Sequence, residues 1–126
     1  MKLNAIGIVS SDFQKSVAFY KILGFEFPAE ITEGHFEATT KEGSARLMLD
    51  SPEMIKSIYG YEPKHSNHSN FAISYDSAPE INNVAEMLKK NNFTIYKEPW
   101  DAFWGQRYCV VQDPDGQYID LYAPLQ

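Results

Sequence analysis

The chain has 126 residues, 44% hydrophobic and 14% aromatic, which suits one globular domain and excludes a disordered segment. Its net charge of −6 comes with no basic stripe for nucleic-acid phosphates, and no apolar run approaches the ~20 residues that span a bilayer. The single cysteine, Cys109, excludes an internal disulfide and is compatible with a reducing compartment, so we expect a cytoplasmic protein without nucleic-acid or membrane partners.

The first 50 residues predict a strand, a helix and three more strands. Residues 3–9 alternate and are rich in Ile and Val, as in a strand. Ser11 or Asp12 then offers a helix N-cap, and Gly24 is a residue type that commonly ends a helix. Three further strands are predicted at Phe25–Ile31, His35–Thr39 and Ala45–Asp50, with a hairpin turn at 41–43 before the last.

Residues 51–69 carry Pro, Gly, Ser and Asn and predict a connector, with one helical turn near Met54–Tyr59. The order of elements then recurs. A strand at Asn70–Tyr75 leads into a helix at Pro79–Asn91 with Ile, Val, Ala and Leu on one side. Three more strands are predicted at Phe93–Lys97, Arg107–Gln112 and Gln117–Tyr122, the last two joined by the turn Asp113–Gly116.

The sequence thus contains βαβββ twice, in residues 1–50 and 70–126 of a single domain. We predict an α+β fold in which the two modules form a curved mixed sheet around a shared cleft, with the helices on the outer face. Each module has one helix, which can cover only one face of its sheet. The other faces are expected to line the cleft.

Strand alternation predicts which side chains face the cleft in the second module. Ile119 and Leu121 suit burial under a helix, so Asp120 and Tyr122 should point the other way. If Asp113–Gly116 is a four-residue turn, Cys109 lies across from Asp120 and Arg107 across from Tyr122. The same reasoning places Asn70 on this face.

In the first module, Leu47 and Leu49 are expected under the helix, which leaves Met48 and its alternate neighbours on the cleft side. Ala5 and Gly7 of the first strand should share that side. Counting back across the hairpin places His35 opposite Met48.

Two motifs carry a resemblance to a known family. Residues 12–20 running to Leu23-Gly24-Phe25, and the turn Asp113–Gly116 followed by Ile119-Asp120-Leu121, stand in the matching halves of the paired βαβββ plan. The chain resembles the vicinal-oxygen-chelate superfamily of glyoxalases, extradiol dioxygenases, antibiotic-modifying enzymes and metal-free drug-binding proteins. The resemblance spans nearly the whole chain.

The resemblance implies where a metal would bind. Metalloenzymes of this superfamily usually supply His or Glu/Gln from the first and last strand of each module, which correspond here to Ala5, Met48, Asn70 and Asp120. Alanine has no donor atom and a thioether suits such divalent ions poorly. We therefore predict no metal and no other cofactor; the remaining candidate ligands are Asn70 and Asp120, with His68 in place of Asn70 as an alternative.

The segment 98–107 is rich in aromatic residues within a loop that contains Pro and Gly. It contributes Trp100, Phe103 and Trp104. The run Trp104-Gly105-Gln106-Arg107, before a strand and the turn Asp113–Gly116, resembles the corresponding segment of bleomycin-resistance-type binding proteins. Such rings can stack a flat or cationic ligand, or pack against a second subunit. Both interpretations stay open. Because members of this superfamily commonly pair and these aromatic residues offer a contact surface, we predict a homodimer.

The favoured function is a metal-free protein that binds an aromatic or cationic small molecule. Its ligand-binding residues would be Trp100, Phe103, Trp104, Arg107, Asp120, Tyr122, Asn70 and Met48. The first alternative is a metal-dependent lyase, isomerase or dioxygenase with a degenerate site, so enzyme activity is left open. The second is a cleft recruited for contact with another protein.

Two residues have competing interpretations. Cys109 is expected to be a small packing residue, because no histidine is placed to activate it and a carboxylate neighbour would raise the pKa of a thiol. Asp120 serves either as a cation site or base, or as an ion-pair partner of Arg107 or Arg46.

Overall fold

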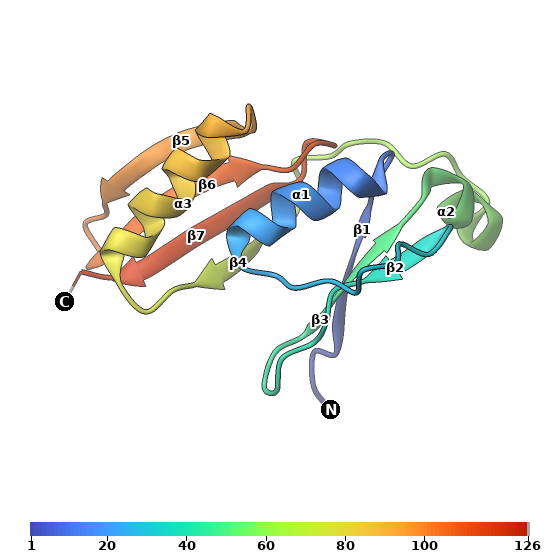
Figure 1. Ribbon diagram of the computed structural model, residues 1–126, viewed down its shortest axis with the longest axis horizontal. Helices are drawn as coiled ribbons and strands as arrows, with labels where there is room; N and C mark the ends of the chain where they lie inside the picture. The colour runs from blue at the N-terminus through green and yellow to red at the C-terminus, as the bar shows by residue number, and fades with distance from the viewer. Residues whose placement is uncertain (126) are drawn as a thin grey trace. The chain divides into compact units, whose positions relative to one another are not determined.

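The computed structural model describes residues 1–125, which divide into two compact units at Lys64 and His65 (Figure 1). Each unit holds one of the two predicted modules together with part of the connector. Within the described residues no helix is long and apolar enough to cross a membrane.

The first unit holds three strands and two helices. The elements are β1 (Ala5–Val9), α1 (Phe13–Leu23), β2 (His35–Glu37), β3 (Arg46–Asp50) and α2 (Pro52–Tyr59). The strand order is β1-β3-β2, with β1 parallel and β2 antiparallel to β3. The predicted alternation in β3 is confirmed, because Leu47 and Leu49 are buried while Arg46, Met48 and Asp50 are half-buried.

Capping explains the bounds of α1. The Asp12 carboxylate, rather than Ser11, accepts the backbone N–H of Lys15 at 3.2 Å. At the other end Gly24 takes a left-handed conformation with φ of 117°, and its N–H bonds to the carbonyl of Lys21. The predicted end of the helix at Gly24 is confirmed, and of the two predicted N-cap residues the structure uses Asp12.

The strand predicted at Phe25–Ile31 is wrong. Only an isolated bridge between Glu26 and Thr39 forms there. Pro28 follows closely and has no N–H to donate to a ladder, which explains why pairing stops. The side chain of Phe27 instead stacks on that of Phe36 at 5.7 Å between ring centroids. The first module is therefore βαβββ with its second strand reduced to one bridge.

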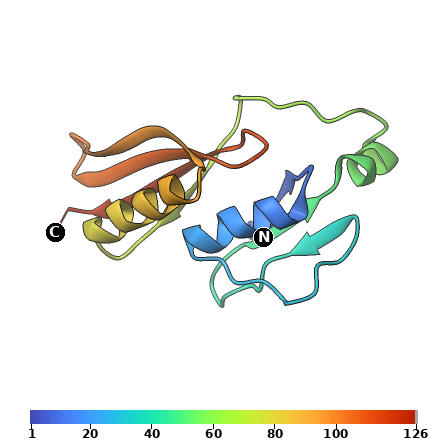
Figure 2. The same cartoon turned by 45° about the horizontal axis from the view of Figure 1, so that its top comes forward.

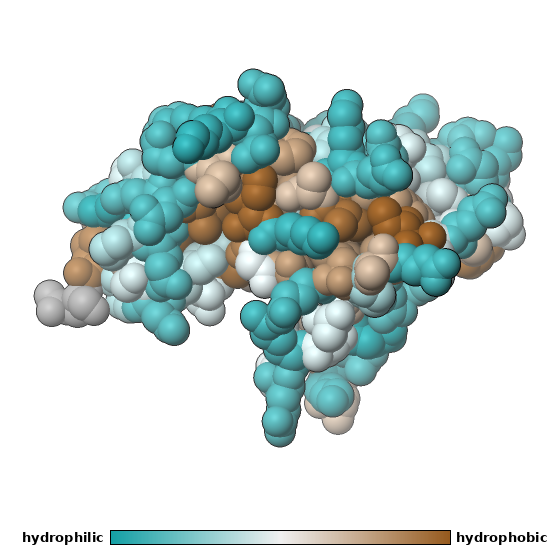
Figure 3. Space-filling model, in the orientation of Figure 1, coloured by the Kyte–Doolittle hydropathy of each residue, from teal (hydrophilic) through white to brown (hydrophobic). Residues whose placement is uncertain are grey.

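The hairpin between β2 and β3 has its turn where predicted. Ser44 donates its N–H to the carbonyl of Lys41 at 3.0 Å, and Gly43 has φ of 82°. The turn projects from the sheet and is hydrophilic on its surface (Figure 3). The predicted register is wrong, however, because His35 pairs with Asp50 rather than with Met48.

The connector holds a longer helix than the single turn predicted near Met54–Tyr59. α2 begins after Ser51, whose hydroxyl accepts the N–H of Met54 at 3.1 Å, and has Pro52 as its first residue. None of its residues is fully buried.

The second unit is a four-stranded sheet with one helix. Its elements are β4 (Phe71–Ser74), α3 (Ala78–Lys90), β5 (Thr94–Asp101), β6 (Gln106–Gln112) and β7 (Tyr118–Pro124). The strand order is β4-β7-β6-β5, with β4 parallel to β7 and the other pairs antiparallel. α3 starts with a capping box in which the Glu80 carboxylate accepts the N–H of Ser77 at 2.9 Å.

α3 covers one face of this sheet. It contacts β5, β6 and β7 and lies along them in both ribbon views (Figures 1 and 2). The residues buried at this contact are Ile81, Ala85 and Leu88 on one side of α3, and, at alternate positions of the strands, Cys109, Val111, Ile119 and Leu121. The opposite face of the β4-β7-β6-β5 sheet is called the open face below.

The turn between β6 and β7 is one residue longer than predicted. Gln112 pairs with Tyr118, so the loop runs from Asp113 to Gln117. The Asp113 carboxylate organises it by accepting the N–H groups of Asp115 and Gln117, each at 2.9 Å. Because side chains alternate between the faces of a strand, this shift of one residue exchanges the two faces of β6 relative to the prediction.

Candidate functional site

The open face of the second unit presents two rows of side chains from directly paired residues. Trp100, Tyr108 and Tyr122 form one row across β5, β6 and β7. Lys97, Val110 and Asp120 form the next. Directly opposite residues in an antiparallel pair share one face of the sheet, so the two rows lie side by side.

A bulge in β5 brings Lys97 and Trp100 to the same face. They are three residues apart, yet their partners Val110 and Tyr108 are only two apart, and the pairing is irregular between them. An extra residue in one strand re-aims the side chains that follow it. Without the bulge, strand alternation would turn one of the two toward α3.

We name five rings the aromatic patch: Trp100, Phe103, Trp104, Tyr108 and Tyr122. Tyr108 is central, with centroid distances of 5.4 Å to Trp100, 5.3 Å to Trp104 and 5.9 Å to Tyr122, on which it stacks. Phe103 meets Trp104 edge to face at 5.0 Å. These spacings are those of favourable aromatic pairs.

The patch leaves large apolar surface in contact with solvent. Phe103 is 97% exposed and Trp104 49% exposed. Exposed rings clustered in this way mark an interaction site more often than scattered single residues do.

Asp120 joins the patch through Tyr108, whose phenol donates to the Asp120 carboxylate at 2.7 Å. Burial, with this hydrogen bond and the nearby negative charge, raises the pKa of Tyr108 to about 12. The phenol is therefore a donor at neutral pH. The two arginines considered as ion-pair partners of Asp120 pair with other carboxylates: Arg46 bonds to Glu37, and Arg107 bonds to Asp101.

Arg107 lies on the other face. It pairs with Ala123, bonds to Asp101, and donates to the side-chain oxygen of Asn82 on α3 at 3.0 Å. The prediction that Arg107 and Cys109 share a face with Asp120 is wrong, because it assumed a four-residue turn between β6 and β7. Cys109 is buried against the helix side, as expected of a packing residue, and burial raises the pKa of its thiol to about 12.

The other residues predicted to bind a ligand or a metal lie outside the two rows of the open face. Asn70 and His68 are exposed and precede β4, and the His68 ring contacts the hydroxyl of Ser69 at 3.3 Å. Met48 lies on β3 in the first unit, beside Gly7. The sequence did not predict that Tyr108 and Lys97 lie on the open face. A loop of the correct length between β6 and β7 would have placed Tyr108 there, whereas the position of Lys97 depends on a bulge that the sequence does not reveal.

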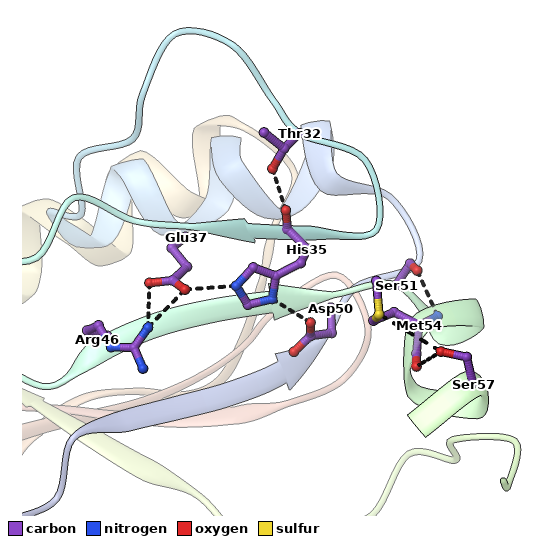
Figure 4. A network of polar contacts seen from close by, with 8 residues as sticks. All are labelled: Thr32, His35, Glu37, Arg46, Asp50, Ser51, Met54 and Ser57. Carbon is purple, nitrogen blue, oxygen red and sulfur yellow. Dashed lines mark hydrogen bonds and ion pairs between the residues drawn. The ribbon is translucent and has the colours of Figure 1, made fainter. Parts of the chain in front are cut away.

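The first unit carries a chain of polar contacts on the sheet face opposite Leu47 and Leu49 (Figure 4). His35 lies between two carboxylates, with Nδ1 2.6 Å from Asp50 and Nε2 2.8 Å from Glu37. Glu37 also accepts Nη1 of Arg46 through both oxygens, at 2.8 and 2.9 Å. The Arg46 guanidinium then donates to the Asn4 side chain.

This chain of contacts requires a charged imidazole. Ionised carboxylates only accept hydrogen bonds, and a neutral imidazole has one N–H, so both contacts of His35 are satisfied only by imidazolium. The hydrogen bonds to Asp50 and then Glu37 raise the pKa of His35 in agreement, and the His35 contact lowers that of Glu37.

Comparisons with known proteins agree with the geometry. Residues 2–121 match the family model described as Glyoxalase/Bleomycin resistance protein/Dioxygenase superfamily. The chain belongs to this superfamily. A Bacillus subtilis (strain 168) protein named Uncharacterized protein YraH is 30% identical over 131 residues, which cover 99% of this chain and 100% of that protein.

Solved structures of the glyoxalase/bleomycin resistance protein/dioxygenase superfamily share the fold. A family enzyme from Burkholderia phytofirmans PsJN matches with a TM-score of 0.84 at 15% identity, covering 99% of this chain and 100% of its own. A protein from Nocardioides gives 0.75 at 22%, covering 100% and 85%. Lactoylglutathione lyase from Agrobacterium tumefaciens gives 0.67 at 13%, covering 97% and 92%.

The metal positions of the superfamily do not fit a metal ion here. Ala5 offers no donor atom and Met48 a thioether, which leaves the oxygens of Asn70 and Asp120. Within residues 1–125 no group of three or more His, Cys, Asp or Glu side chains is arranged to hold an ion. The contacts of His35 do not provide one, since its two carboxylates lie at opposite nitrogens and a ring presents only one nitrogen to an ion.

Proposed function

We propose that this member of the superfamily binds an aromatic or cationic small molecule, without a metal, on the open face of its second unit. The observation that carries the proposal is the aromatic patch with Asp120 beside it. Stacked rings give a planar ligand apolar contact, and a carboxylate among rings favours a positive charge. Trp100, Trp104, Tyr108, Tyr122 and Asp120 are the proposed contacts.

Tryptophan fluorescence tests the proposal directly, because both tryptophans of the chain belong to the patch. We expect a naphthyl probe such as 2-naphthylmethylammonium to quench this fluorescence saturably, and calorimetry to give the same affinity. Trp104→Ala should weaken binding at least about fivefold, since an aromatic contact contributes about 1 kcal/mol beyond burial. Tyr59→Ala on α2, which also removes an exposed ring, is the matched control and should bind normally.

Metal dependence separates the proposal from a metal-dependent enzyme. Protein purified without chelator and supplied with divalent ions should retain no stoichiometric metal by elemental analysis, and chelator should not change the probe affinity. A retained stoichiometric metal, with binding lost in Asp120→Ala, would favour the enzyme instead.

We also propose a cytoplasmic homodimer in which Phe103, the most exposed ring of the patch, contacts the second copy. Light scattering coupled to size-exclusion chromatography should report a dimer, and Phe103→Ser should shift it toward monomer. A wild-type protein that elutes only as monomer contradicts this.

A further inference from the structure

Two opposite charges flank the centre of the open face in the second unit. Lys97 and Asp120 are the ends of the row whose middle residue is Val110. Their backbones are two strand spacings apart, roughly 10 Å. The half-buried Val110 side chain between them, with the row of Trp100, Tyr108 and Tyr122 alongside, provides an apolar floor.

The ammonium of Lys97 rests on a ring rather than on a carboxylate. It lies 4.0 Å from the centroid of Trp100. Lys56 and Lys89, in contrast, each approach a glutamate at 2.7 Å. A cation–π contact at an exposed site is weak, so an anion can draw this ammonium toward itself.

Asp120 also keeps binding capacity. Its Oδ2 accepts the phenol of Tyr108 at 2.7 Å, and an ionised carboxylate offers about four lone-pair sites. The bond to Tyr108 fixes the orientation of the carboxylate without neutralising it. A ligand ammonium or N–H donor can therefore bond to the same group.

We infer that the ligand of this face is a zwitterionic aromatic compound, with its carboxylate or other anionic group at Lys97, its cationic donor at Asp120, and its planar body over Val110 and against the aromatic patch. This inference rests on the proposed function and narrows it. A purely cationic ligand would meet the like charge of Lys97, and a purely anionic one that of Asp120.

Three probes with the same ring test the inference by calorimetry. 6-(Aminomethyl)-2-naphthoate carries both charges, 2-naphthylmethylammonium only the positive one, and 2-naphthoate only the negative one. We expect the zwitterion to bind at least about tenfold more tightly than either single-charge probe. Neutral 2-naphthalenemethanol reports binding to the rings alone.

Two variants assign the charges to their residues. Lys97→Met should reduce the zwitterion to the affinity of the ammonium probe and leave the ammonium probe as tight or tighter. Asp120→Asn, whose amide oxygen still accepts from Tyr108, should reduce the zwitterion to the affinity of 2-naphthoate. Lys90→Met, an exposed lysine in the last turn of α3, is the control and should change nothing.

The outcomes separate this inference from the function on which it rests. If the ammonium or neutral probe binds and depends on Trp104, but the zwitterion binds no more tightly, the inference is wrong and the proposed function stands. Equal weakening of zwitterion and ammonium probe by Lys97→Met also overturns it. If none of the four probes binds, both are overturned.

Discussion

The two units turn very different surfaces away from their buried sheet faces. In the first unit, Arg46, Glu37, His35 and Asp50 satisfy one another in a continuous chain of hydrogen bonds and ion pairs. In the second, Lys97 and Asp120 contact aromatic side chains instead of opposite charges.

The difference shows that two modules of one plan can present a surface of paired charges in one unit and a surface of unpaired charges beside aromatic rings in the other. A charge that already has its partner gains little from a ligand, because binding must first break the existing contact. A charge held only by a ring or a phenol keeps that capacity. This contrast supports the proposal that the ligand binds on the second unit and that the polar chain of the first unit has a structural role.

Adjacent valines on β6 test whether the open face is truly distinct from the core. Val111 is fully buried on the α3 side, whereas Val110 is half-buried on the open face. Val111→Ala should lower the free energy of unfolding by about 2 kcal/mol, and Val110→Ala by less than about 1 kcal/mol. Denaturant titration measures both; equal losses would mean that the open face is packed like the core.

The pH dependence of His35 tests whether the first unit's polar chain is structural. Its folded-state pKa is raised above 6.5, so its stabilisation is full below that value and is lost as pH rises through the folded pKa. The pKa of Glu37 is lowered, so its contribution is lost as pH falls through that pKa. The groups are partly exposed, so each effect should stay below about 1 kcal/mol.

NMR titration of the imidazole and unfolding at about pH 6 and about pH 9 give the two readouts for this polar chain. His35→Gln should remove the alkaline loss of stability while leaving probe binding on the second unit unchanged. A His35 that titrates below 6.5 in the folded protein would contradict the charged arrangement.

The smallest effect is expected at Arg107, which checks the strand register. Its side chain lies on the α3 side with Asp101 and Asn82. Arg107→Gln should therefore leave probe affinity unchanged and cost less than about 1 kcal/mol of stability. A large loss of probe binding would instead place Arg107 on the face proposed to bind the ligand.

Local chemistry let much of the fold be predicted. An N-cap at Ser11 or Asp12, the helix end at Gly24 and the alternation around Leu47 and Leu49 depend on neighbours within a few residues, so they can be predicted along the chain; the structure chose Asp12. The family resemblance rested on the same local patterns and is confirmed by the match over residues 2–121.

The composition of the open face needed the tertiary structure. The presence of Trp100, Trp104 and Asp120 in the second half is a property of the sequence, but their neighbours depend on register. The Asp113 carboxylate widens the β6–β7 loop by one residue, and a single-residue shift exchanges Arg107 for Tyr108.

The sequence by itself therefore determined the paired modules, the end of the first helix at Gly24 and the residue types at the positions where the resemblance implies a metal, because each follows from residue type and short-range spacing. Only the tertiary structure decided that Lys97 and Trp100 share a face and that His35 sits between two carboxylates. Both depend on pairing between strands, where a bulge or one extra loop residue costs little energy locally but re-aims every side chain beyond it.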